Sequence, residues 1–225
     1  MPGVPAREAW TSTPGRAHVA AIVLAAGSST RMGRNKLLLD LGGETMVRRA
    51  VRAAVGAGVD QVVVVLGHDE PRVRAELAGL PCTPVVNPDH ARGAGTSLRT
   101  GVRRVAAAAD AVVVVLADMP FVTAEMIATL VARYRDTAAP LVTSHYGEVQ
   151  APPTLYARAL FEEILSIPDE GGGKEVVRRH EQEAAVVAWS EPARRDVDGP
   201  ADYERVRADL ASVPQAIPMK TPDRA

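Results

Sequence analysis

The sequence predicts an α/β fold in which a mostly parallel β-sheet is flanked by helices. Short runs of β-branched residues alternate along the chain with longer stretches of helical periodicity, an order typical of a parallel sheet joined by crossover helices. The runs QVVVVL at residues 61–66 and AVVVVLA at residues 111–117 are apolar at almost every position. Strands of that kind are buried on both faces, so helices are expected to cover the sheet.

Strands and helices are expected in alternation along most of the chain. The strands are expected at residues 19–24, 61–66, 83–86, 111–117, 141–143 and 184–189. The helices are expected at residues 45–57, 70–78, 96–109, 123–135, 157–166, 173–182 and 201–212. Gly56 and Gly58 are suited to ending the first helix, and Thr123 is placed to cap the start of the fourth.

The composition is that expected of one globular domain with flexible ends. With 225 residues and 47% hydrophobic content, the chain can bury a substantial core. The tails at residues 1–16 and 214–225 are rich in proline and in small or polar residues, so the domain is expected to span residues 17–213. The single cysteine, Cys82, cannot form an intramolecular disulfide, and residues 1–16 lack the apolar core of a signal peptide. A cytoplasmic location is therefore expected.

The charge balance argues against two classes of partner. The formal net charge is −1, and the basic residues are interspersed with acidic ones. Neither nucleic acid nor a membrane surface is therefore an expected partner. No apolar run approaches the length of a bilayer span, because even the run at residues 111–117 ends at Asp118.

The most informative segment is VAAIVLAAGSSTRMGRNK at residues 19–36, in which an apolar strand leads into a loop of small residues. The small residues at positions 25–27 leave room for a ligand to approach main-chain N–H groups. Three cations suited to phosphate oxygens follow, namely Arg31, Arg34 and Lys36. The glycine spacing fits neither the Walker pattern nor G-x-G-x-x-G. The loop therefore predicts a phosphate site of another kind, the alternative being a solvated basic turn.

A carboxylate follows the second of the buried runs. Asp118, in AVVVVLADMP, stands at the end of an expected strand and at the same sheet edge as the glycine loop. Mg²⁺ prefers one or two protein carboxylates together with phosphate oxygens and water. The position predicts a magnesium ligand facing a triphosphate. The alternative is an aspartate that helps to cap the turn at Met119 and Pro120.

The pattern LAAGxSxRMGxxK over residues 24–36 resembles the signature of the MobA-like nucleotidyltransferase superfamily, whose members share a modified Rossmann fold. Within it, the form LAAG followed by KLLL is most similar to the molybdenum cofactor cytidylyltransferase group, whereas the guanylyltransferase relatives usually read LAGG. The resemblance implies a Rossmann-like sheet with a nucleotide site. It assigns nucleotide binding to Leu24, Ala25, Ala26, Gly27 and Ser28, and catalysis to Arg31 and Lys36, which would neutralise charge on the α-phosphate and the departing pyrophosphate.

A second acidic position lies far downstream. The segment RDVDGPADY at residues 195–203 resembles the family's DIDTPEDY. The resemblance implies that Asp198 completes a Mg²⁺ site with Asp118, and Asp196 is the less favoured choice. Asp198 would also stand just before a helix that starts at Pro200, so a helix cap is the alternative.

The resemblance places base and ribose contacts between these landmarks. The segment RGAGTSLRTG at residues 92–101 is similar to the family's loop and helix start, where glycines let the backbone approach a ring. Asn87 offers both a donor and an acceptor, and Ser97 offers a hydroxyl near the helix N-terminus. Simple N-capping by Thr96 and Ser97 is the alternative. His68 is a further candidate for lining the base pocket, against the alternative of a structural histidine.

The acceptor side matches the family less well. Family members that act on molybdopterin usually show a G-x-P segment and a later GDxGAR segment, where this chain reads QAPP at residues 150–153 and DEGGGK at residues 169–174. Glu170 would stand for the aspartate and Lys174 for the arginine, although lysine lacks arginine's bidentate geometry. The glycine run could equally be a mobile loop before a helix.

These features predict a Mg²⁺-dependent nucleotidyltransferase. It would transfer CMP from CTP, or another nucleotide from a related triphosphate, to a phosphorylated small-molecule acceptor with release of pyrophosphate, and molybdopterin is the first-choice acceptor. The attacking phosphate oxygen is already anionic near neutral pH, so no general base is required. Two alternatives stay open. One is an NAD(P)H-dependent oxidoreductase of the nicotine blue oxidoreductase type on the same fold, and the other is a nucleotide-binding protein without turnover.

Overall fold

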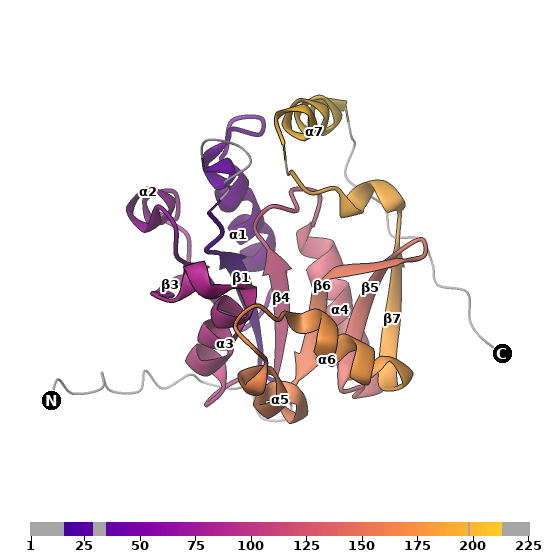
Figure 1. Ribbon diagram of the computed structural model, residues 1–225. Helices are drawn as coiled ribbons and strands as arrows, with labels where there is room; N and C mark the ends of the chain where they lie inside the picture. The colour runs from indigo at the N-terminus through magenta and orange to yellow at the C-terminus, as the bar shows by residue number, and fades with distance from the viewer. Residues whose placement is uncertain (1–15, 29–34, 198, 213–225) are drawn as a thin grey trace, which may run out of the picture.

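A seven-stranded sheet forms the centre of the molecule, with strand order β3-β2-β1-β4-β6-β5-β7 (Figure 1). The computed structural model describes residues 16–28, 35–197 and 199–212. The strands are β1 (Val19–Ala25), β2 (Gln61–Leu66), β3 (Thr83–Val86), β4 (Ala111–Leu116), β5 (Leu141–Tyr146), β6 (Val149–Ala157) and β7 (Ala184–Trp189). β1 pairs in parallel with β2 and β4, and β6 is antiparallel to β4 and β5. The expected α/β fold with a mostly parallel sheet is confirmed.

Most strands lie where the sequence pattern predicts them. The strands at residues 61–66, 83–86 and 184–189 have the expected bounds. β1 extends to Ala25, β4 ends one residue early at Leu116, and β5 runs on to Tyr146.

β6 is the strand that the sequence pattern does not predict. Its run contains Pro152 and Pro153, and proline is rare inside strands because it cannot donate a ladder hydrogen bond. The strand accommodates both prolines because neither has a partner on either side: the pairing with β4 is confined to residues 154–157, and the pairing with β5 shifts register between Ala151 and Leu155. The helix expected at residues 157–166 is therefore wrong in its first turns, since Ala157 ends β6 and α5 begins only at Phe161.

Helices cover the sheet on both faces. The helices are α1 (Met46–Gly56), α2 (Glu70–Ala75), α3 (Ala94–Val105), α4 (Ala124–Thr137), α5 (Phe161–Ser166), α6 (Gly173–Arg179) and α7 (Pro200–Ser212). Alternate β1 residues face two cores: Val23 packs with side chains of α1 and α4, and Ile22 packs with side chains of α3 and α5. A Cβ at Gly101 would lie 2.4 Å from Ile22 Cγ2, so this glycine lets α3 approach β1 closely.

The helix ends show which local predictions hold. Thr123 caps α4 as expected, its hydroxyl accepting the Met126 N–H at 3.2 Å. α3 begins at Ala94, two residues before the expected start, and Gly93 is its N-cap. Thr96 and Ser97 therefore lie inside the helix, and N-capping by either is wrong. Short 3-10 helices lie at Lys36–Leu38, His90–Arg92, Arg158–Leu160, Glu181–Glu183 and Glu191–Arg194.

The structure tests little of the expected tails, and it bears on the expected absence of a bilayer span only for the described helices. Of the expected flexible tails, Arg16 alone lies among the described residues, so the tails stay a prediction. None of the described helices combines the length and the apolar character that crossing a bilayer requires.

Candidate functional site

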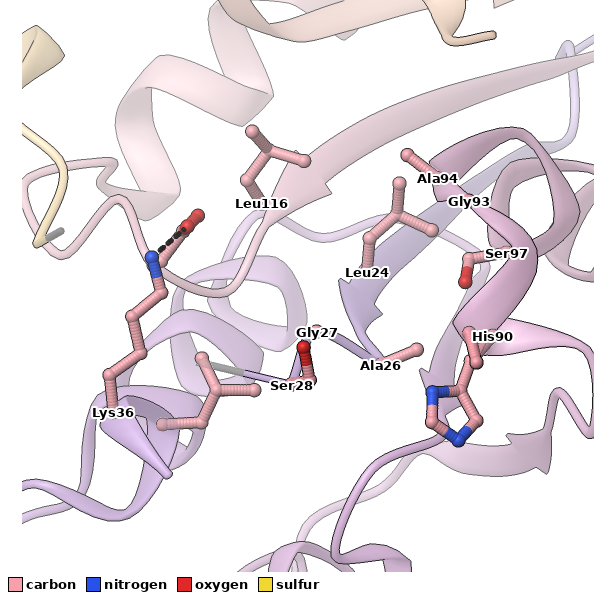
Figure 2. Close-up of a pocket in the computed structure, with 13 residues that line it drawn as sticks. Leu24, Ala26, Gly27, Ser28, Lys36, His90, Gly93, Ala94, Ser97 and Leu116 are labelled. Carbon is pink, nitrogen blue, oxygen red and sulfur yellow. Dashed lines mark ion pairs between the residues drawn. The ribbon is translucent and has the colours of Figure 1, made fainter. Parts of the chain in front are cut away.

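A pocket of about 420 Å³ opens at the carboxyl ends of β1 and β4, where open α/β sheets place their ligands. In Figure 2, Ala26, Gly27 and Ser28 lie between Lys36 on one side and Ser97 and His90 on the other. The pocket is lined by Leu24, Ala26, Gly27, Ser28, Lys36, Leu37, His90, Ala91, Gly93, Ala94, Ser97, Leu116 and Asp118. The structure thus brings the two predicted landmarks, the small-residue loop and Asp118, into one site.

The loop after β1 supplies much of the pocket floor. Leu24, Ala26, Gly27 and Ser28 line it, whereas Ala25 faces the hydrophobic core and is 1% exposed. A Cβ at Gly27 would meet no described atom within 4 Å, so the space above this residue is open to a ligand. The expected cation Arg31 lies outside the described residues.

Lys36 and Asp118 form an ion pair across one wall of the pocket. The Lys36 Nζ atom lies 2.7 Å from Asp118 Oδ2, and the two side chains are 13% and 26% exposed (dashed line in Figure 2). Local structure fixes the lysine, because the buried Asn35 side chain accepts the Leu37 N–H and starts the 3-10 helix at Lys36–Leu38. Limited exposure on both sides strengthens the attraction relative to a surface pair.

Asp118 supplies the one carboxylate among the lining residues that the structure describes. Among the described residues, no three histidine, cysteine or acidic side chains cluster as a metal site would need. Mg²⁺, however, takes only one or two protein carboxylates when phosphate oxygens and waters complete its shell. The second expected ligand, Asp198, lies outside the described residues. The described residue before it, Val197, donates its N–H to the Asp118 carbonyl oxygen at 3.3 Å.

The opposite wall is formed by the start of α3 and the turn before it. Ser97 lines the pocket as expected and is 5% exposed. Asn87 lies behind this wall: it is 1% exposed, and its side-chain amide donates to Thr96 Oγ1 and Ser97 Oγ. His68 is exposed and outside the lining, with its ring centroid 6.4 Å from that of His90.

His90 lines the pocket, and the sequence pattern does not predict it there. A Cβ at Gly67 would lie 2.6 Å from His90 Cβ, so this glycine makes room for the histidine. Its position between Asn87 and Gly93, in a segment that resembles the family's base-binding loop, is the signal that could have found it. Leu37 and Leu116, which the sequence pattern also does not predict in the site, add apolar surface.

The loop at residues 167–172 packs on the wall formed by α3. Asp169 pairs with Arg99 and Arg92, and its carbonyl oxygen accepts the Gly95 N–H at 2.9 Å. The hydrogen bond from Arg99, together with the charge of Arg92, holds the pKa of Asp169 below its usual range despite desolvation. A Cβ at Gly93 would lie 2.3 Å from Asp169 O, so contact with this loop explains the glycine.

The two residues expected on the acceptor side belong to the same region but not to the pocket lining. Glu170 and Lys174 are both exposed. Neither lines the cavity at the end of β1, so the structure places them beside the nucleotide pocket rather than in it.

Comparison with known proteins identifies the family. Residues 21–184 match the MobA-like NTP transferase domain. The chain is 29% identical over 196 residues to purine catabolism protein PucB of Bacillus subtilis strain 168, covering 83% of this chain and 94% of PucB. It is 27% identical to the bifunctional protein GlmU of Corynebacterium diphtheriae, covering 85% of this chain but only 41% of GlmU.

A solved structure agrees with the match. The manganese complex of Rv0371c from Mycobacterium tuberculosis H37Rv superposes with a TM-score of 0.71 at 28% identity, covering 87% of this chain and 100% of Rv0371c. The superfamily resemblance seen in the sequence is thereby confirmed. The chain belongs to the MobA-like NTP transferase domain family.

Proposed function

We propose that the protein is a metal-dependent nucleotidyltransferase that transfers CMP from CTP to a phosphorylated small-molecule acceptor and releases pyrophosphate. The observation that carries the proposal is the single pocket that joins residues 26–28, Lys36 and Asp118 in a chain of the NTP transferase family. Backbone donors, a cation and a carboxylate are the groups that nucleotidyl transfer requires around a triphosphate.

The reaction would be an in-line displacement at the α-phosphorus. An oxygen of the acceptor's phosphate forms the new P–O bond while the bond to the β-phosphate breaks, and pyrophosphate leaves with that electron pair. Lys36 and Arg31 would neutralise charge on the α-phosphate and on the leaving group, while backbone N–H groups of residues 26–28 orient the phosphates. The attacking oxygen carries no proton near neutral pH, so this scheme needs no general base.

Asp118 and Asp198 are the proposed ligands of the divalent ion, with Mg²⁺ as the expected metal. The bond from the Val197 N–H to the Asp118 carbonyl supports this pairing, because it brings the chain next to Asp198 up to Asp118. Rv0371c, a similar protein, has been crystallised with manganese. Such an ion would screen the triphosphate charge and polarise the phosphate that is attacked.

CTP and molybdopterin are the proposed donor and acceptor. Their support is the sequence LAAG at residues 24–27 followed by KLLL at residues 36–39, the form similar to molybdenum cofactor cytidylyltransferases. Ser97 is the proposed base or ribose contact, because it lines the pocket, whereas Asn87 lies behind it and His68 lies outside the lining. Glu170 and Lys174 are the proposed acceptor contacts. A cytoplasmic location goes with this proposal.

The test is a matrix of substrates read by pyrophosphate release. Each of the four ribonucleoside triphosphates is incubated with Mg²⁺ or Mn²⁺, in the presence or absence of molybdopterin. Release with CTP that depends on both metal and molybdopterin is the expected result. Release of pyrophosphate with another triphosphate or another phosphorylated acceptor would support a nucleotidyltransferase but show that CTP or molybdopterin is not its substrate.

A further inference from the structure

The side chain of Asn87 is bonded on every side within the protein. Its Oδ1 accepts the backbone N–H of Asp89 at 3.0 Å. Its Nδ2 donates to Thr96 Oγ1 at 2.8 Å and to Ser97 Oγ at 2.9 Å. A primary amide has two N–H protons, so both are used in these two bonds. Asn87 is 1% exposed and leaves no donor for a ligand.

The orientation of this amide is fixed rather than arbitrary. A backbone N–H can only donate, so the atom of Asn87 that faces Asp89 must be the oxygen, and the NH₂ group must face α3. Thr96 agrees with this orientation. Its single hydroxyl proton is directed to the Gly93 carbonyl at 2.7 Å or to the Asp89 carbonyl at 3.1 Å, so it can only accept from Asn87.

The bond from Asn87 also decides whether the Ser97 hydroxyl can donate into the pocket. Its oxygen accepts from Asn87, and its side chain lines the pocket. In Figure 2 the Ser97 hydroxyl lies on the same side of the pocket as His90, across from Lys36. Because the bond from Asn87 takes a lone pair, the hydroxyl proton of Ser97 is the group left to face the cavity.

We infer that Asn87 is a positioning residue that makes Ser97 a hydrogen-bond donor toward an acceptor atom of the bound nucleoside, either a base carbonyl or a ribose oxygen. This inference rests on the proposed function, since it takes the pocket to hold a nucleoside triphosphate. It differs from a direct contact between Asn87 and the base. Asn87 acts only through Ser97, and its loss should have no effect on binding once the Ser97 hydroxyl is absent.

The experiment is a double-mutant cycle read by calorimetric binding of CTP with Mg²⁺. Ser97→Ala removes the donor, and a lost neutral hydrogen bond should weaken CTP roughly 3–10-fold. Asn87→Ser is too short to reach Ser97 but can still accept the Asp89 N–H in a serine turn. It should weaken CTP binding when Ser97 is intact and change nothing when it is combined with Ser97→Ala.

Two further variants sharpen the cycle. Thr96→Val removes the other bond from Asn87, and Thr96 does not line the pocket, so CTP affinity should stay within about 2-fold. Asn87→Asp still accepts the Asp89 N–H and can accept the Ser97 proton, which turns that proton away from the cavity. Its bond to Thr96 is lost, because the Thr96 proton is already directed to a backbone carbonyl. Asn87→Asp should weaken CTP more than Ser97→Ala does, and it replaces Asn87→Ser in the cycle if that variant does not fold.

A parallel titration with 2′-deoxyCTP identifies the acceptor atom. If that atom is the ribose 2′-oxygen, wild type and Ser97→Ala will bind the deoxynucleotide equally. If it is elsewhere on the nucleoside, Ser97→Ala will weaken both nucleotides by the same factor. Undiminished CTP binding by Ser97→Ala, or an equal loss from Asn87→Ser with and without Ser97→Ala, overturns the inference. A wild-type protein that binds no nucleoside triphosphate instead overturns the proposed function, and the inference with it.

Discussion

The Lys36 ammonium lies 2.7 Å from the Asp118 carboxylate, so the proposed phosphate contact and the proposed metal ligand are paired with each other. The pair links the end of β4 to the 3-10 helix at Lys36–Leu38, on one wall of the pocket. A divalent cation and an ammonium seek the same carboxylate oxygens, whereas a triphosphate attracts both cations. Nucleotide and metal should therefore bind to this site cooperatively.

Lys36→Ala should reduce turnover far more than it reduces stability. A cation aimed at charge that develops in the transition state is typically worth on the order of 10² to 10³ in rate. The ion pair itself should contribute on the order of 1 kcal/mol to folding, because both side chains retain some exposure. Steady-state kinetics and thermal unfolding of the variant measure the two effects. Wild-type turnover in Lys36→Ala would remove the residue from the mechanism.

The same variant should bind metal more tightly when no nucleotide is present. With Lys36 removed, Asp118 has lost the cation that lies against its Oδ2 atom, and Mn²⁺ meets less competition for the carboxylate. We expect an increase of several-fold in Mn²⁺ affinity, measured by electron paramagnetic resonance. Asp118→Asn should abolish the binding, and Asp198→Asn should weaken it. Full metal binding and activity in Asp198→Asn would leave that residue as a helix cap.

The sequence predicts that the glycine loop and Asp118 share one sheet edge, but it does not predict the ion pair between Lys36 and Asp118. β1 and β4 are apolar runs of a parallel sheet, so periodicity alone places the loop after Ala25 and Asp118 at one edge. The direct contact of Lys36 with Asp118 could not be read from the pattern. It depends on the turn started by Asn35, whose side-chain bond to Leu37 is a local detail without periodicity.

Two expected ligand contacts, at Asn87 and at the glycines of residues 92–101, differ from the structure because of tertiary packing. The amide of Asn87 can donate and accept, which favours a base contact, but burial and three internal bonds place it behind the wall. The glycines of the segment at residues 92–101 predict room for a ring, whereas a Cβ at Gly93 would meet the backbone of Asp169. Contacts between segments this far apart in sequence follow from tertiary packing, which a single sequence does not display.

Packing of the 167–172 loop on α3 predicts a sharp contrast between two glycines. A Cβ at Gly95 would lie 2.2 Å from the Pro168 carbonyl oxygen, whereas one at Gly172 would meet no described atom within 4 Å. Because the obstacle is backbone, Gly95→Ala should cost about 1–3 kcal/mol in the free energy of unfolding, and Gly172→Ala should be close to neutral. Urea denaturation of both variants provides the comparison. Equal stability of the two would show that the loop is not packed on α3 in this way.

Stability should depend on pH through His180. Its ring nitrogens lie 2.7 Å from Glu163 Oε2 and 3.1 Å from Glu183 Oε1. The hydrogen bond with Glu163 is the main cause, and that with Glu183 the second, of a pKa of His180 above its ordinary value of about 6.5. The stabilisation is therefore complete below the unfolded pKa and is lost as the pH rises through the higher folded pKa.

The variant His180→Gln isolates this contribution. The partly exposed pair should give wild type an advantage in melting temperature of no more than about 2–4 °C near pH 5.5. The advantage should shrink as the pH is raised toward 9. Melting temperatures measured in steps across that range decide the matter, and a gap between the two proteins that stays constant or widens with pH contradicts the assignment.

Chelation of metal should separate the transferase from the oxidoreductase alternative. A loop of small residues at the end of a strand serves NAD(P)H and CTP alike, since both present phosphates to backbone N–H groups. A nicotinamide-dependent reductase, however, has no need of a carboxylate such as Asp118 facing the phosphates, whereas nucleotidyl transfer uses one to hold its metal. Pyrophosphate should therefore form only when Mg²⁺, CTP and a phosphorylated acceptor are present together, and EDTA should abolish it. Asp118→Asn should reproduce the effect of EDTA in the untreated protein. Oxidation of NADPH by a quinone in the presence of EDTA, with no pyrophosphate from any nucleoside triphosphate, would show instead that this pocket serves redox chemistry.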